Sequence, residues 1–218
     1  MKNCRLAILV SGNGTNLQAI LDAIKKDAIE DAIKTGSGFP AEVALVLSNN
    51  AQAYALERAR QHNISTVVID HHTFKSREDF EKGLIAAIDS AQADLVVLAG
   101  FMRVLSPFFV KYYKGRILNI HPALLPSFPG THAIQQAWDY GVRVTGVTVH
   151  FVDEGTDTGP VVLQEAVPIS EKESLESLEK KIHAVEHRLF PEAIRLYAEG
   201  RLTIKDNKGR KVFIGERA

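Results

Sequence analysis

A strand, a glycine-rich loop and a helix follow one another at the start of the chain, and this order restricts the folds open to the rest. Residues 5–10 form a mostly aliphatic run that stops at Ser11, and Gly12 and Gly14 come directly after it. From Leu17 onward, apolar residues recur at the spacing of an amphipathic helix. A strand that enters a helix through glycines is typical of the first unit of an α/β sheet.

This alternation continues along the chain. We expect strands at residues 43–47, 66–69, 95–98 and 117–120, with helices at 51–62, 77–89 and 107–113. Two strands at 144–152 and 161–169, a helix at 175–198 and a hairpin of 202–205 with 212–214 follow. The pattern predicts an α/β protein with a three-layer, Rossmann-like, mostly parallel sheet that binds its ligands at the carboxyl ends of the strands.

Two segments fall outside this alternation. Residues 27–40 are poor in packing residues, and we expect them to form a surface insertion between the first helix and the second strand. Pro122, Pro126 and Pro129 punctuate a long loop after the strand at 117–120. Long loops inside compact domains are usually functional, so this second segment is a candidate part of a site.

The composition excludes several classes of protein. Of the 218 residues, 45% are hydrophobic and 24% are charged, as in ordinary globular domains, and we expect one domain over residues 1–218. The 26 basic and 26 acidic residues balance, which gives no charge signature for nucleic acid or an anionic membrane. The longest apolar run, residues 95–102, is far shorter than the roughly 18 residues of a membrane span. With Cys4 as the single cysteine, we expect a cytoplasmic protein.

The glycine loop is suited to bind an anion. Gly14, Thr15 and Asn16 open a helix, where backbone N–H groups and the helix dipole favour phosphate. Asn16 stands where a dinucleotide fingerprint has its third glycine, and the second strand ends in residues 48–50 without an acidic ribose ligand, so NAD is disfavoured. Two interpretations stay open, a phosphomonoester site and a structural turn capped by Thr15 or Asn16.

A polar pair ends one of the central strands. The alternation of a strand places Asn119 and His121 on the same face. An amide that donates to a developing oxyanion, beside an imidazole that moves protons near pH 7, suits acyl transfer to an amine. Asp157 in a polar turn is the candidate carboxylate that would keep the imidazole protonated, with Asp153 and Glu154 as alternatives. A hydrogen-bonded structural histidine is the competing interpretation.

Four motifs occur in one order over nearly the whole chain. They are Ser11-Gly-Asn-Gly-Thr-Asn-Leu-Gln18, Leu98-Ala-Gly-Phe-Met-Arg-Val-Leu-Ser106, Asn119-Ile-His-Pro-Ala-Leu-Leu-Pro126 and Asp157-Thr-Gly-Pro160. Together they resemble the glycinamide ribonucleotide formyltransferase family of purine biosynthesis. The resemblance implies a formyltransferase fold with partly antiparallel C-terminal strands, an N-terminal half that binds the phosphate-bearing substrate and a C-terminal half that binds folate. It implies transfer of the formyl group of 10-formyltetrahydrofolate, a co-substrate, to the amine of 5-phosphoribosylglycinamide.

The family's site residues match positions of this sequence. The catalytic trio is matched by Asn119, His121 and Asp157. The phosphate loop is matched by Gly14, Thr15 and Asn16, and the ribose contact by Glu186. The folate positions are matched by Arg77, Met102, Arg103, Val104, Leu105 and Asn119. Residues 101–105 and 152–157 would supply an apolar slot for the pterin.

The resemblance also implies a mechanism and a set of partners. The amine attacks the formyl carbon directly, Asn119 and protonated His121 stabilise the oxyanion, and Asp157 sustains the imidazolium while a water relays protons. No metal, nucleic acid or membrane is implied, and the protein would be a monomer or a homodimer. Two departures from the family pattern concern loop geometry: Ala123 replaces the commoner serine, and residues 27–40 are longer than usual.

Other functions compete with this interpretation. His183, Glu186 and His187 spell the H-x-x-E-H pattern of a zinc protease, but no suitable acidic ligand follows. A sugar-phosphate-binding module could use the same scaffold without catalysis. A methionyl-tRNA formyltransferase would need a basic nucleic-acid-binding domain, and a formyltetrahydrofolate hydrolase usually carries an extra N-terminal domain. We expect neither domain in this chain.

Overall fold

A nine-stranded mixed sheet runs through the computed structural model, which describes residues 3–34, 38–205 and 210–216. The strand order is β3-β2-β1-β4-β5-β6-β7-β9-β8. The strands are β1 (Cys4–Val10), β2 (Ala41–Ser48), β3 (Thr66–Val68), β4 (Leu95–Leu98), β5 (Ile117–His121), β6 (Val144–Phe151), β7 (Val161–Pro168), β8 (Leu202–Lys205) and β9 (Lys211–Ile214). The helices are α1 (Thr15–Lys34), α2 (Tyr54–Gln61), α3 (Arg77–Ser90), α4 (Pro107–Tyr112), α5 (Ala133–Tyr140) and α6 (Leu175–Ala198), with a 3-10 turn η1 (His71–Thr73).

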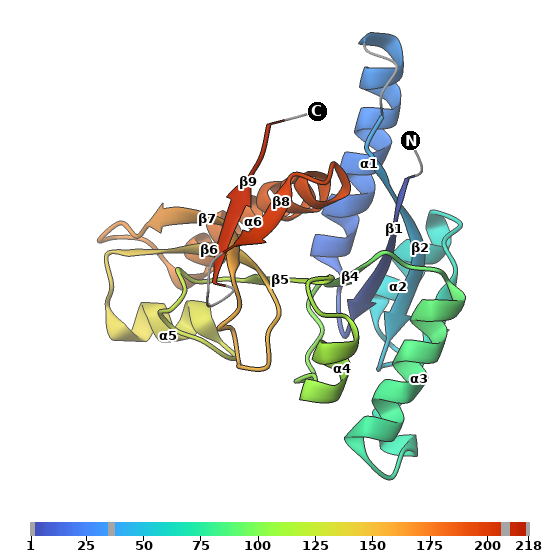
Figure 1. Cartoon of the computed structure of the whole chain (residues 1–218). Coiled ribbons are helices and arrows are strands. Elements are labelled where there is room, and N and C mark those ends of the chain that lie inside the picture. The colour runs from blue at the N-terminus through green and yellow to red at the C-terminus, as the bar shows by residue number, and fades with distance from the viewer. Residues whose placement is uncertain (1–2, 35–37, 206–209, 217–218) are drawn as a thin grey trace.

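Three layers follow from the alternation of side chains along the buried parallel strands. In β1, Leu6 and Ile8 pack into a cluster with α1, α2 and α6. Ala7 and Leu9 point to the other face and pack into a cluster with α3 and α4. Figure 1 shows α1 and α3 on opposite sides of the sheet. The predicted three-layer α/β fold is confirmed.

The sheet changes polarity beside β5. Strands β1 to β5 pair in parallel, whereas β6 pairs antiparallel with both β5 and β7. The last hairpin, β8 with β9, joins β7 in parallel through one bridge pair of the described residues, Val161 with Lys211. The expected partly antiparallel C-terminal strands are confirmed, and the carboxyl end of β5 lies at the border between the two halves of the sheet.

The predicted surface insertion at residues 27–40 is wrong for most of its length. The first helix continues to Lys34, and its far end projects beyond the sheet in Figure 1. Residues 27–34 contain neither glycine nor proline and are rich in good helix formers, which explains the continuation. Phe39 and Ala41 are buried, so the chain is back in the core where β2 begins. Residues 35–37 lie outside the described part of the chain.

The structure contains one helix that the sequence pattern did not predict, α5. It begins after His132 and ends at Gly141, both of which have left-handed backbone, and no side chain caps its start. Its apolar residues Ile134 and Trp138 do recur at helical spacing, but the helix directly follows the proline-punctuated loop and no capping side chain marks its start. Gly141 at the C-terminal end was the sign that could have revealed it.

The ends of the last elements agree with the sequence pattern. The α6 helix starts after Ser174, whose hydroxyl accepts a hydrogen bond from the Ser177 N–H as a cap. The two strands of the terminal hairpin are present, whereas its predicted turn at residues 207–209 lies outside the described residues.

In the described ranges, no helix combines the length and the apolar composition that crossing a membrane requires.

Candidate active site

The end of β5 carries Asn119 and His121, and the turn before β7 places a carboxylate against both. Asp157 Oδ2 lies 3.4 Å from His121 Nδ1. Asp157 Oδ1 lies 3.5 Å from Asn119 Nδ2, at the outer limit of a hydrogen bond. The structure therefore brings the three predicted residues together, and the long amide contact is one that a substrate oxygen can replace.

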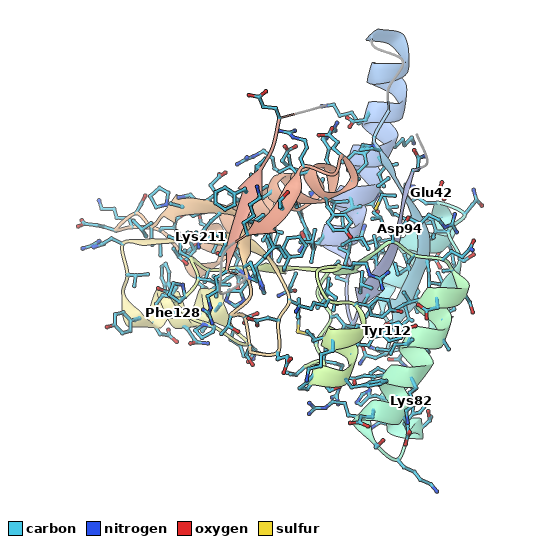
Figure 2. The ribbon with its side chains drawn as sticks, viewed as in Figure 1. Glu42, Lys82, Asp94, Tyr112, Phe128 and Lys211 are labelled. Atoms are coloured by element: carbon cyan, nitrogen blue, oxygen red, sulfur yellow. The ribbon has the colours of Figure 1, made fainter. Side chains whose placement is uncertain are left out.

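Both ring nitrogens of His121 face oxygen atoms. Nε2 lies 2.8 Å from the carbonyl oxygen of Phe128, and Nδ1 faces the Asp157 carboxylate. A carbonyl and a carboxylate only accept hydrogen bonds, so the imidazolium, which has a donor on each nitrogen, satisfies both contacts. Phe128, on the loop after β5, lies at the end of the molecule away from Lys82 of α3 (Figure 2). This geometry supports a protonated His121.

His150 is a fourth member of the cluster, which sequence reasoning did not name as a site residue. Its Nδ1 donates to the Phe151 carbonyl oxygen at 2.8 Å, so its Nε2 is free to accept the Asn119 amide N–H at 3.2 Å. The same Nε2 lies 3.6 Å from Asp157 Oδ1. The β5–β6 register pairs Asn119 with His150, and that antiparallel register is the signal that would have found this residue.

Asp157 sits in left-handed backbone, with φ at 53°, and its Oδ2 accepts the Gly130 N–H at 2.7 Å. Burial alone would raise the pKa of its carboxyl, but the contact with His150, the hydrogen bond from the Gly130 N–H and the charge of His121 outweigh burial and lower that pKa. Asp157 is therefore ionised at neutral pH.

The two alternative carboxylates serve other contacts. Asp153 Oδ1 accepts from the Gly155 N–H and the Thr158 hydroxyl, and Glu154 lies 3.6 Å from Lys111 Nζ. The geometry thus selects Asp157 among the three candidates as the partner of His121.

Thr148 fixes the loop that follows His121. Its buried hydroxyl donates to the Ala123 carbonyl oxygen at 2.7 Å and accepts from the Leu125 N–H at 3.1 Å and from Gln164 Nε2 at 2.9 Å. Ala123 itself is fully buried. The contact of Thr148 is with the backbone of residue 123, so the loop is held without the serine that is commoner at that position.

Cys4 offers no nucleophile to the site. Burial, with a smaller contribution from the charge of Asp94, raises the pKa of the Cys4 thiol to about 12. A thiol attacks as its thiolate, which is scarce at neutral pH under these conditions. Cys4 is therefore not a candidate nucleophile.

The glycine loop packs its backbone tightly against α2. Gly14 has φ at 76°, and a Cβ built on it would lie 2.5 Å from the Ala55 Cβ. Arg58 of the same helix donates to the Asn13 carbonyl oxygen at 2.9 Å and to its side-chain Oδ1 at 3.1 Å. The Oδ1 of Asn16 is buried without a hydrogen-bond partner in the described structure. The loop is thus rigid and holds a polar group that a ligand can satisfy.

Gly14→Ala is expected to lower the free energy of unfolding by about 2–3 kcal/mol, from the left-handed backbone and the contact with Ala55. Urea unfolding monitored by circular dichroism measures this. Gly12→Ala is the matched control, because a Cβ there meets nothing within 4 Å, and its effect should stay within about 0.5 kcal/mol. Equal losses in the two variants would contradict the tight packing at Gly14.

The loop at residues 101–106 presents side chains to solvent. Phe101 is buried in the core, whereas Met102 and Val104 are 69% and 66% exposed. Arg103 is exposed, Leu105 is half-buried, and Arg77 is exposed at the start of α3. Large exposed apolar side chains on one short loop indicate a binding surface rather than core packing. Their role toward folate stays a prediction.

A cavity of about 330 Å³ opens beside Asp157. Its wall includes Leu125, Pro126 and Pro129 of the proline loop and the turn at 156–161, with Arg210 at its edge. An apolar wall with a few polar groups is typical of small-molecule sites. The expected slot from residues 101–105 and 152–157 is present only in part, because the proline loop and not residues 101–105 supplies the wall.

Glu186 lies buried on α6 and pairs with His183, whose Nδ1 is 2.7 Å from the Glu186 Oε2. The ring of His187 stacks on that of His183 with centroids 6.3 Å apart. Among the described residues, the acidic and histidine groups close enough to share a metal ion are Asp70, His71 and His72 and do not include this trio. The zinc-protease pattern therefore lacks the geometry of a ligand set.

Comparison with protein families and known proteins gives concordant matches. The family model described as "Formyl transferase" matches residues 4–194. The phosphoribosylglycinamide formyltransferase of Escherichia coli (strain K12) is 44% identical over 202 residues, which are 93% of this chain and 91% of that protein. The trifunctional purine biosynthetic protein adenosine-3 of Drosophila pseudoobscura pseudoobscura is 46% identical over 198 residues. That match covers 91% of this chain but 14% of the longer protein, so the chain spans a small part of such relatives.

A solved structure extends the match to the fold. Glycinamide ribonucleotide transformylase 1 from Symbiobacterium toebii superposes with a TM-score of 0.89 at 46% identity. The superposition covers 98% of this chain and 95% of that one. The similarity thus includes the antiparallel C-terminal half of the sheet as well as the parallel half.

Proposed function

The chain belongs to the formyl transferase family, and on this premise we propose that it transfers the formyl group of 10-formyltetrahydrofolate to the amine of 5-phosphoribosylglycinamide. The products are formyl-phosphoribosylglycinamide and tetrahydrofolate, in the biosynthesis of purines toward IMP. The observation that carries the proposal is the near full-length match to a phosphoribosylglycinamide formyltransferase. The cluster at the end of β5 offers the groups that such a reaction needs.

The proposed chemistry is a direct attack. The substrate amine adds to the formyl carbon, the carbon–N10 bond of the donor breaks, the amine loses one proton and N10 gains one. Asn119 Nδ2 donates to the oxyanion of the tetrahedral intermediate, and the positive charge of protonated His121 stabilises it, since charged and polar groups fixed in advance are most effective there. Asp157 and the Phe128 carbonyl oxygen hold the His121 ring in place and favour its charged form. A water that relays the protons completes the proposal.

The two substrates are proposed to meet at the border of the sheet. The N-terminal half holds the phosphate at Gly14, Thr15 and Asn16, and a ribose hydroxyl would satisfy the unpartnered Asn16 Oδ1. Glu186 is the proposed ribose contact. The C-terminal half and the loop after β4 take the folate, with contacts from Arg77, Met102, Arg103, Val104, Leu105 and Asn119. The division of residues 1–218 into these two binding halves within one domain is part of the proposal.

The proposed setting follows from the substrates. Both are small soluble molecules, so we place the activity in the cytoplasm, with no metal, nucleic acid or membrane partner. A monomer or a homodimer would serve equally well, because each contact proposed above comes from one chain.

An absorbance assay of formyl-folate consumption tests the function. Purified protein is given 10-formyltetrahydrofolate with phosphoribosylglycinamide, with water alone, or with methionyl-tRNA. Turnover that requires the ribonucleotide supports the proposal. Consumption without an acceptor would indicate a hydrolase, and turnover with the tRNA would indicate a methionyl-tRNA formyltransferase. No consumption in any of the three assays, with intact ligand binding, would favour a binding module.

Asp157 makes the stability of the site depend on pH. Its carboxyl has a lowered pKa in the folded protein, so ionised Asp157 stabilises the fold above its unfolded pKa, about 3.9, and this contribution is lost as the pH falls through the folded pKa. The difference in the free energy of unfolding between the wild type and Asp157→Asn should therefore be full at pH 6–7 and shrink below about pH 4. Urea unfolding across that range measures it.

Asp153→Asn is the control for the loss of one charge, because Asp153 lies in the same loop but does not face His121. A wild-type advantage over Asp157→Asn that stayed constant from pH 7 to pH 3 would contradict the ionised, paired state of Asp157.

A further inference from the structure

The hydroxyl of Ser11 joins two loops that are each proposed to bind a substrate. The glycine loop is proposed to bind phosphoribosylglycinamide, and the loop at residues 101–106 is proposed to bind folate. Ser11 follows β1 and precedes the glycine loop. Its Oγ accepts the Met102 N–H at 2.8 Å and donates to the Asn49 Oδ1 at 2.6 Å. Its own N–H donates to the Gly100 carbonyl oxygen at 3.1 Å. One serine thereby ties the loops after β1, β2 and β4 together.

The far end of the loop at residues 101–106 is fixed independently. Glu81 of α3 is fully buried, and its carboxylate accepts the Ser106 N–H at 2.6 Å and the Ser106 hydroxyl through a second oxygen. A buried carboxylate with two hydrogen-bond donors is a firm anchor. Between the anchors at Ser11 and Glu81, the side chains of Met102 and Val104 remain in solvent. The loop is thus held at both ends by groups that leave its exposed face free.

We infer that Ser11 is a positioning residue, which sets the loop at residues 101–106 against the glycine loop and so aligns the formyl carbon with the amine. The inference rests on the proposed function. Ser11 lies outside the set of residues proposed to contact either substrate, so its effect passes through Met102 and the backbone. Alignment of two bound reactants matters because a misplacement of about 1 Å can cost about 100-fold in rate.

Removal of the Ser11 hydroxyl should lower kcat more than it weakens the binding of either substrate alone. Ser11→Ala leaves the Met102 N–H and the Asn49 amide without their shared partner. We expect kcat to fall about tenfold, within the range that loop misplacement allows. Dissociation constants for phosphoribosylglycinamide alone and for tetrahydrofolate alone should change by less than about threefold, because each loop keeps its own contacts. Ser11→Thr, which restores a hydroxyl, should recover most of kcat.

Ser174→Ala is the matched control. That serine also accepts a backbone N–H, from Ser177 at 3.2 Å, but it caps α6 and touches neither loop. Its kcat should equal that of the wild type within about twofold. Urea midpoints of all variants, measured in parallel, report the loss of stability separately from the loss of rate.

Three outcomes would overturn the inference. They are an unchanged kcat in Ser11→Ala, a rise in either single-substrate dissociation constant that matches the fall in kcat, and an equal loss of kcat in Ser174→Ala. A wild-type protein that shows no ribonucleotide-dependent transfer would instead overturn the proposed function. The wild-type assay therefore distinguishes the two failures before any variant is compared.

Discussion

Replacement of His121 by alanine should lower kcat for formyl transfer roughly 1,000-fold, the middle of the range for a positioned general acid–base group. The ring is 4% exposed and is held between the Phe128 carbonyl oxygen and the Asp157 carboxylate. His121 is the ionisable side chain at the end of β5 that contacts this carboxylate, so the variant loses the group that can hold and transfer a proton there. KM for either substrate should change much less than kcat, because the lost interaction acts mainly on the transition state.

Steady-state kinetics with both substrates varied give these constants. Circular dichroism and a urea midpoint establish that the variant is folded, which is necessary because His121 is buried. His72→Ala, which removes an exposed histidine from η1, is the control for histidine loss and should keep kcat within about twofold. A His121→Ala enzyme with a near-normal rate would remove His121 from the mechanism.

Asn119→Ala should lower kcat by about 100- to 1,000-fold, the usual cost of one oxyanion donor. The His150 Nε2 accepts one amide N–H and so orients the Asn119 side chain, while the weak contact to Asp157 leaves the other N–H for the substrate oxygen. Asn119→Asp keeps the shape of the side chain but replaces the donor with a second carboxylate beside Asp157. Its kcat should fall at least as far as that of the alanine variant.

Binding measurements separate this effect from a loss of folate affinity. Asn119 is also a proposed folate contact, so the dissociation constant of tetrahydrofolate is measured for each variant. An Asn119→Asp enzyme that matched the wild type in kcat would show that the amide N–H donates nothing in the transition state.

The sequence predicted the parallel half of the fold well because its signals are local. The strands around Leu6, Val46 and Val97 are buried runs between glycine-rich or polar turns, and the helices between them carry apolar faces. The prediction for the first helix ended too early because half of residues 27–34 are charged, although Ile29 and Ile33 continue the helical spacing of apolar residues. The helix α5 was missed because it directly follows the segment with Pro122, Pro126 and Pro129, which the sequence pattern assigns to a long loop.

The candidate site, like the fold, was predictable only where its signals are local. Asn119 and His121 were recognisable because strand alternation puts both on one face. The choice of Asp157 over Asp153 depends on a left-handed residue in the turn, and the part played by His150 depends on the register of β6 against β5. These are long-range features that spacing along the chain does not encode. For the same reason, the links from Ser11 to Met102 and from Glu81 to Ser106 were invisible before the fold was known.

The single bridge between β7 and β9 bears on colloidal behaviour. Most of the outer edge of β7 is unpaired by β9, since Val161 with Lys211 is the one pair that the described residues form. An open strand edge is a template for pairing with another chain, and proteins protect such edges with short covering strands and charged side chains. The hairpin of β8 and β9 is such a covering strand pair, and the ion pair of Glu165 on β7 with Arg188 of α6 supplies the charged side chains. Truncation before Leu202 would accordingly favour self-association through β7 while leaving the cluster at β5 in place.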